Sequence, residues 1–198
     1  MSTSGAADRT WSPMSRRLLL ALPLPKVASN ELANNCSSII SGTNNLRPVG
    51  ASNYHITVHF FGNLQSNQLD QVRALSQYNI GVTGLPLFCR LGGIAQMPKN
   101  DRARLLYAEL KEGWSAVISF IKKVYKVVAA AGFPVQFPHL LPHITVARVR
   151  RGVNFISSLI TPWSSSPFLL DRLVLYESFL SRAGVRYEPS DCQKRTSL

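Results

Sequence analysis

The tetrapeptide His-Ile-Thr-Val occurs twice in the chain, beginning at His55 and again at His143. Each copy alternates polar and β-branched residues, which predicts a short β-strand. Side chains alternate between the faces of a strand, so each histidine shares one face with the threonine of its copy, Thr57 or Thr145. If the two strands lie side by side, two imidazoles and two hydroxyl groups converge on one cleft. We expect such a cleft to move protons around a negatively charged oxygen.

The net charge favours an anionic partner. The chain has 198 residues and a formal net charge of +12, with a hydrophobic content of 45%, which is ordinary for a globular protein. Lys and Arg that contact phosphates release counterions, so a basic excess of this size indicates nucleic acid before membrane. A generically basic soluble protein is the alternative that charge alone leaves open.

Cysteine usage and hydrophobicity indicate a cytoplasmic protein. The three cysteines are an odd number at no metal-ligand spacing, which predicts a reducing compartment without a disulfide or zinc framework. The apolar run 18–22 ends at Pro23 and is far shorter than the ~20 residues of a membrane span. We interpret it as a core strand rather than as part of the export signal that Arg16 and Arg17 could imitate.

The order of apolar patterns and breakers predicts an α+β chain of two similar halves, each with a long helix, a motif strand and a shorter helix. We expect two lobes with pseudo-symmetric antiparallel sheets and flanking helices around a central groove. Residues 1–15 are predicted to be a disordered leader, 16–190 the two-lobed domain, and 191–198 a polar basic tail.

The individual elements follow from the same patterns. Predicted strands cover residues 17–22, 54–61 (ended by Gly62), 85–95 (one strand, or a pair broken at Gly92 and Gly93), 105–110, the second motif and 168–176, before a hairpin around Gly184. Predicted helices cover residues 28–40, 66–75, 114–128 and 154–160. The lysines at 122, 123 and 126 are expected on a solvated helix face.

The segments 54–62 (YHITVHFFG) and 142–148 (PHITVAR) resemble the paired H-x-T-x motifs of the two-histidine phosphoesterase superfamily. Within it they are most similar to the RNA 2′,3′-cyclic phosphodiesterase (2′-5′ RNA ligase) family. Residues 17–23 resemble the opening strand of that family, and 173–178 resemble its late L-Y-E-S strand. The resemblance covers roughly residues 16–190.

The resemblance implies a fold, an activity and roles for five residues. The activity is the opening of a 2′,3′-cyclic phosphate by water to give a 2′-phosphomonoester, on RNA ends or small cyclic nucleotides. His55 is the implied proton donor and His143 the implied acceptor, although the sequence by itself does not order these roles. Thr57 and Thr145 would donate to the phosphate oxygens, and Arg148 would bind the phosphate. No metal, cofactor, membrane or obligate protein partner is implied.

Other interpretations remain open at the level of sequence. The histidines could be core residues, the threonines simple β-formers and Arg148 a surface arginine. Strict alternation places Arg148 on the face opposite His143, so its role requires a bend, a bulge or a strand end. Alternation also places His59 on the face of His55, where we expect a bystander at the cleft rim.

Two other functions also remain open. One is RNA ligation, which is the reverse reaction at the same site. The other is a non-catalytic RNA-binding module that uses a basic groove alone.

Overall fold

The fold was analysed in a computed structural model, which describes residues 16–77, 84–98, 103–135, 140–150, 163–181 and 184–190. The predicted leader (1–15), the tail (191–198) and the helix predicted at 154–160 lie outside the described residues. The predicted domain limits therefore stay a prediction.

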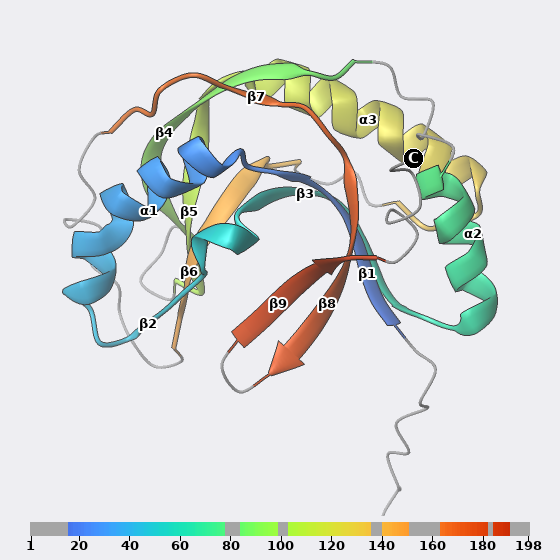
Figure 1. Cartoon of the computed structure of the whole chain (residues 1–198), viewed down its shortest axis with the longest axis horizontal. Helices are drawn as coiled ribbons and strands as arrows, with labels where there is room; N and C mark the ends of the chain where they lie inside the picture. The colour runs from blue at the N-terminus through green and yellow to red at the C-terminus, as the bar shows by residue number, and fades with distance from the viewer. Residues whose placement is uncertain are drawn as a thin grey trace, which may run out of the picture.

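Nine strands of the described chain form one curled antiparallel sheet, seen in Figure 1 as an open half-barrel. Its order is β7-β4-β5-β6-β3-β1-β8-β9, and β2 also pairs with β6. The strands are β1 (Arg16–Pro23), β2 (Leu46–Pro48), β3 (His55–Leu64), β4 (Leu87–Met97), β5 (Leu105–Glu112), β6 (His143–Val149), β7 (Phe168–Leu170), β8 (Val174–Ser181) and β9 (Gly184–Pro189). The helices are α1 (Lys26–Ser41), the short η1 (Ala51–Asn53), α2 (Ser66–Gln77) and α3 (Trp114–Ala130).

The prediction of an α+β fold with two similar halves is confirmed. One half of the sheet is β3-β1-β8-β9 and the other is β6-β5-β4-β7. The two halves are one continuous sheet rather than two separate sheets, because β3 and β6 pair at the centre with Ile56 opposite Ile144. The two motif strands are therefore neighbours, as the motifs require.

The two faces of the sheet have different roles. Alternate residues of the central strands, such as Ile56, Val58, Ile144 and Val146, belong to one buried hydrophobic core. The helices α1 and α3 contribute buried stripes to the same core, and each fully buried aliphatic side chain stabilises the fold by roughly 1.5–3 kcal/mol. The histidines and threonines of the motifs point away from this core, so the helices leave their face of the sheet open.

The long third helix differs in one detail from its predicted stripe. Val117, Ile121, Val124 and Val128 are buried as expected, and the three lysines at 122, 123 and 126 are exposed. Trp114, which the periodicity assigns to the buried stripe, is 37% exposed. It is the first residue of the helix, where the chain is still leaving the sheet.

The predicted strand 168–176 is wrong. It consists of two strands, β7 and β8, separated by the segment 171–173, because the exposed Asp171 and Arg172 interrupt the apolar run. β7 pairs with β4 and β8 pairs with β1, so the chain crosses from one half of the sheet to the other here. The hairpin around Gly184 joins β8 to β9 as predicted.

Two smaller differences concern the strands. The first motif strand continues past Gly62 to Leu64, with Gly62 at φ +76° beside an irregularity in its pairing with β1. β4 is a single strand through Gly92 and Gly93, which is one of the two predicted alternatives, and its pairing with β5 shifts register there. The short strand β2 was not expected from the sequence.

Among the described residues, no helix is long and apolar enough to cross a membrane.

Candidate active site

The register of β3 and β6 brings the two motifs together. Ile56 lies opposite Ile144 in an antiparallel pair, so His55 lies beside Thr145 and Thr57 lies beside His143. The two histidines are then diagonal neighbours, which in antiparallel sheets are roughly 7–8 Å apart. The two motif copies are thus related by a near-twofold axis. At this separation, the two histidines can contact opposite sides of one phosphate group.

A bulge at the last residue of the second motif turns Arg148 toward the histidines. In the pairing of β5 with β6, Leu106 lies opposite Ala147 but Tyr107 lies opposite Thr145, so Val146 is an extra residue. Val146 and Ala147 are both buried, and Arg148 returns to the exposed side. The expectation that a bulge must re-aim this arginine is confirmed.

The same irregularity in β3 overturns the prediction for His59. Leu20 of β1 pairs with His59 and Ala21 pairs with Thr57, so Val58 is the extra residue. His59 consequently points to the core face and is 7% exposed. Its ring packs against Phe61 and Tyr125 at centroid distances of 4.6 and 5.7 Å. His59 is therefore not at the rim of the cleft. The prediction of its face was wrong because strict alternation along the sequence takes no account of bulges.

Both motif histidines are anchored in the same way. The Nδ1 atom of His55 lies 2.7 Å from the carbonyl oxygen of Asn53, and Nδ1 of His143 lies 2.7 Å from the carbonyl oxygen of Leu141. A carbonyl only accepts, so Nδ1 carries a proton in each ring and Nε2 is left for chemistry. Each Nε2 can therefore accept a proton when the ring is neutral and donate one when it is charged.

Aromatic rings enclose the imidazole of His55. Tyr187 lies edge-on at a centroid distance of 4.7 Å, and Tyr176 lies at 6.1 Å. Burial lowers the pKa of His55 below its ordinary value; the backbone hydrogen bond to Asn53 raises it, and the nearby His143 lowers it further. Among the described residues, the ring of Tyr107 lies 5.3 Å from that of His143, centroid to centroid.

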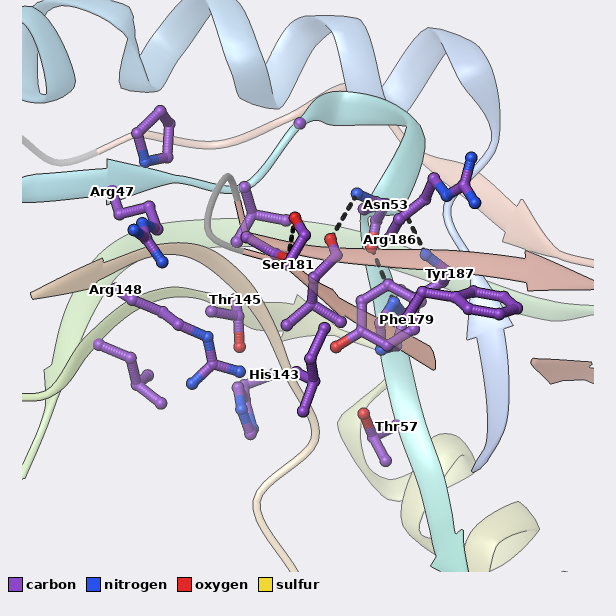
Figure 2. Close-up of a pocket in the computed structure, with 18 residues that line it drawn as sticks. Arg47, Asn53, Thr57, His143, Thr145, Arg148, Phe179, Ser181, Arg186 and Tyr187 are labelled. Carbon is purple, nitrogen blue, oxygen red and sulfur yellow. Dashed lines mark hydrogen bonds between the residues drawn. The ribbon is translucent and has the colours of Figure 1, made fainter. Parts of the chain in front are cut away.

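All five site residues predicted from the sequence line one cavity of about 700 Å³ (Figure 2). This volume is within the usual range for small-molecule sites. The described lining contains three arginines and two histidines but no aspartate or glutamate. The lining residues are Arg47, Pro48, Val49, Gly50, Asn53, His55, Thr57, Leu105, His143, Thr145, Arg148, Phe179, Leu180, Ser181, Gly184, Val185, Arg186 and Tyr187. The cavity is thus suited to an anion.

Sequence reasoning missed Asn53, which connects the first motif to the β8–β9 hairpin. Its backbone carbonyl holds His55. Its side chain donates to the carbonyl oxygen of Val185 at 3.3 Å and accepts from the backbone N–H of Tyr187 at 3.4 Å. One residue therefore fixes both the imidazole and the strand whose Tyr187 covers it. In the sequence, the position of Asn53 two residues before His55 was the available signal of this role.

Arg47 and the hairpin residues Phe179 and Arg186 were also missed as lining residues. They come from segments far from either motif, and only the curl of the sheet brings them to the cavity. Within the described residues, no group of three His, Cys, Asp or Glu side chains could hold a metal ion. The described site places imidazoles that can transfer protons beside hydroxyl and guanidinium donors.

Comparison with known proteins gives one relative in sequence. No protein-family model matches the chain. An RNA 2′,3′-cyclic phosphodiesterase of Aquifex aeolicus (strain VF5) is 25% identical over 104 residues. The match covers 52% of this chain and 54% of that protein, so the chain matches about half the length of this relative.

Solved structures match over most of the chain. TT0787 of Thermus thermophilus has a TM-score of 0.70 at 21% identity, covering 87% of this chain and 94% of that one. LigT of E. coli, complexed with 3′-AMP, has a TM-score of 0.71 at 21% identity, covering 89% and 95%. The PDE domain of MHV ns2 has a TM-score of 0.52 at 12% identity, covering 80% and 99%. At these identities the matches show a shared fold.

Proposed function

The fold, the relative in sequence and the paired motifs support the family of LigT-like two-histidine phosphoesterases, and on this premise we propose that the chain opens 2′,3′-cyclic phosphates by water. The substrate class is RNA ends or nucleotides that carry the cyclic phosphate, and the product is a 2′-phosphomonoester. The observation that carries the proposal is the pair of identically anchored imidazoles, each beside a threonine, on neighbouring strands in one cavity without carboxylates in its described lining.

The proposed reaction uses each Nε2 once. Neutral His143 accepts a proton from water as the water oxygen bonds to phosphorus. The bond from phosphorus to the 3′ oxygen breaks, and protonated His55 donates a proton to that oxygen. The phosphate stays on the 2′ oxygen, and one water molecule is consumed. Throughout, the two Nδ1–H groups stay bonded to their carbonyls and hold the rings in place.

The other three proposed site residues stabilise the negative charge of the phosphate group. The hydroxyls of Thr57 and Thr145 donate to the non-bridging oxygens, where charge accumulates in the transition state. Arg148 supplies a planar guanidinium for the same phosphate. The anionic substrate also favours the charged form of His55, which offsets the lowering of its pKa by burial.

Product analysis tests the proposal directly. Purified protein is incubated with adenosine 2′,3′-cyclic phosphate, and the 2′- and 3′-phosphates are separated by chromatography. We expect adenosine 2′-phosphate as the product, formed equally well in the presence of EDTA. Absence of turnover, or formation of the 3′-phosphate, contradicts the proposal. Parallel incubation with 2′-phosphate and 5′-hydroxyl RNA ends detects ligation, which is the reverse reaction.

Histidine variants test the proposed acid and base. His55→Ala and His143→Ala should each lower kcat about 10²–10⁴-fold, or roughly 3–5 kcal/mol in barrier, because each removes one proton-transfer group. The matched control is His59→Phe, because His59 belongs to the same strand but faces the aromatic core. Its kcat should stay within about twofold of the parent. Near-parental kcat in either alanine variant excludes that histidine as acid or base.

A further inference from the structure

Two arginines lie opposite each other at the edge of the cavity. β2 and β6 pair antiparallel with Arg47 opposite Arg148, and both side chains line the cavity (Figure 2). Both residues are exposed, so their guanidinium groups are accessible to a ligand from solvent. Like charges directly opposite each other across a sheet destabilise the pair. Phosphate groups bound next to the two guanidinium groups would offset this repulsion.

The arginine pair is connected to the reacting groups by short segments. β6 carries His143 and Thr145, then reaches Arg148 after the bulge, which places Arg148 roughly 10 Å or less along the strand from Thr145. β2 continues through η1 to Asn53 and His55. The pair is therefore held at a fixed position beside the proposed reaction centre, on one side of it.

The opposite wall of the cavity has a different character. There Phe179 and the 61%-exposed Leu180 of β8 present apolar surface. Arg186 on that wall lies over the Phe179 ring at 5.4 Å and forms an ion pair with Glu188 at 3.1 Å. The wall formed by β2 and β6 contributes two arginines, Arg47 and Arg148, to a cavity whose described lining contains no carboxylate.

We propose that Arg47 forms a second phosphate subsite next to Arg148: Arg148 binds the reacting 2′,3′-cyclic phosphate, and Arg47 binds the 5′-phosphate of the same nucleotide. This inference rests on the proposed function and narrows its substrate class. In an RNA chain that 5′-phosphate is the link to the preceding nucleotide, whereas a free nucleoside 2′,3′-cyclic phosphate lacks it. The site is therefore built for the end of an RNA chain or a 5′-phosphorylated nucleotide.

The experiment compares two substrates that differ only in the 5′-phosphate. These are adenosine 2′,3′-cyclic phosphate with and without a 5′-phosphate, and the quantity compared is the ratio of their kcat/KM values. We expect the parent to prefer the 5′-phosphorylated substrate, and Arg47→Ala to lower the ratio about tenfold. Arg47→Lys should retain part of the preference for the 5′-phosphorylated substrate, because lysine keeps the positive charge but lacks the planar guanidinium group. Arg73→Ala, on α2 and outside the cavity lining, is the matched control and should leave the ratio within about twofold of the parent.

Salt dependence provides a second readout. For single strands, removing one phosphate-binding cation lowers the slope of log affinity against log salt by about 0.7. We expect this decrease in Arg47→Ala for a short oligoribonucleotide that ends in a 2′,3′-cyclic phosphate, and no change for adenosine 2′,3′-cyclic phosphate, which has no 5′-phosphate. If Arg47→Ala lowers both kcat/KM values by the same factor, or if the parent shows no preference, the second subsite is excluded.

Failure of the proposed function gives a separate result. If the parent turns over neither substrate, the dissociation constants of adenosine 2′-phosphate and adenosine 2′,5′-bisphosphate are compared by calorimetry. Tighter binding of the bisphosphate that depends on Arg47 retains the subsite without the enzyme. Equal binding of both by parent and Arg47→Ala overturns the subsite as well.

Discussion

His59 shows how one extra residue in a strand changes the chemistry of a side chain. It stands four residues after His55, yet the bulge at Val58 turns it into the aromatic core. There burial lowers its pKa to about 4, from an ordinary value of 6.5. A histidine in this state stays neutral at the pH where the proposed acid and base exchange protons, so it stabilises the fold as an aromatic ring.

This pKa predicts a loss of stability in acid. Between pH 6.5 and pH 4 the unfolded chain binds a proton at His59 that the folded chain does not, so the free energy of unfolding falls as the pH falls. The loss from this group approaches about 3 kcal/mol at pH 4 and is absent above pH 6.5. His59→Phe should remove it. Urea unfolding of parent and variant at about pH 7 and about pH 4.5 measures the difference, and equal pH dependence of the two contradicts the assignment.

At the scale of elements, the sequence predicts which strands carry the site but not the face of the sheet to which every side chain points. The alternation in both motifs correctly places each histidine beside a threonine. The position of Arg148 could be predicted because its proposed role demands a bulge, and Val146 supplies it. Nothing in the sequence demanded the equivalent bulge at Val58, so His59 was assigned to the wrong face. Bulges depend on the partner strand, which local patterns do not describe.

The connection from Asn53 to β9 predicts an effect on His55 at a distance. Asn53→Ala keeps the backbone carbonyl that anchors His55 but removes both side-chain hydrogen bonds to β9. Tyr187 should then cover the imidazole less completely, so the pKa of His55 should rise toward its ordinary value. NMR titration of the imidazole measures this, and kcat should fall about threefold to tenfold, as expected when positioning weakens by roughly 1 kcal/mol.

Tyr187→Phe is the control for this prediction. It keeps the ring that lies 4.7 Å from His55 and removes only the hydroxyl, so the imidazole should titrate as in the parent. If Asn53→Ala lowers the melting temperature while the titration of His55 stays unchanged, Asn53 stabilises the hairpin without positioning the imidazole.

At the scale of the molecule, the two-halved plan was predictable but the cavity was not. Two similar runs of strands and helices indicate two halves, and the paired motifs indicate that they meet. The curl that brings β2 and the β8–β9 hairpin over the motif strands depends on the pairing of distant strands. Arg47 and Tyr187 were missed for this reason, and the single continuous sheet was missed with them.

The fold also divides the charge of the molecule between two faces. The net charge is +12, and the basic wall of the cavity lies on the open face of the sheet, whereas α3 packs on the core face with its lysines exposed. We therefore expect kcat/KM for a short oligoribonucleotide ending in a 2′,3′-cyclic phosphate to fall more steeply with salt than for a cyclic mononucleotide. Each additional phosphate bound should contribute about 0.7 to the slope of the double-logarithmic plot.

A variant of α3 separates the cavity from the general charge of the surface. Replacing Lys122, Lys123 and Lys126 together by glutamine removes three of the 22 basic residues without touching the cavity lining. If the RNA lies along the β2–β6 wall, the salt slope of this variant should match that of the parent, since ions screen charges beyond about 10 Å at about 0.1 M salt. A flatter slope in the lysine variant would instead place the bound RNA across α3, on the face of the sheet away from the histidines.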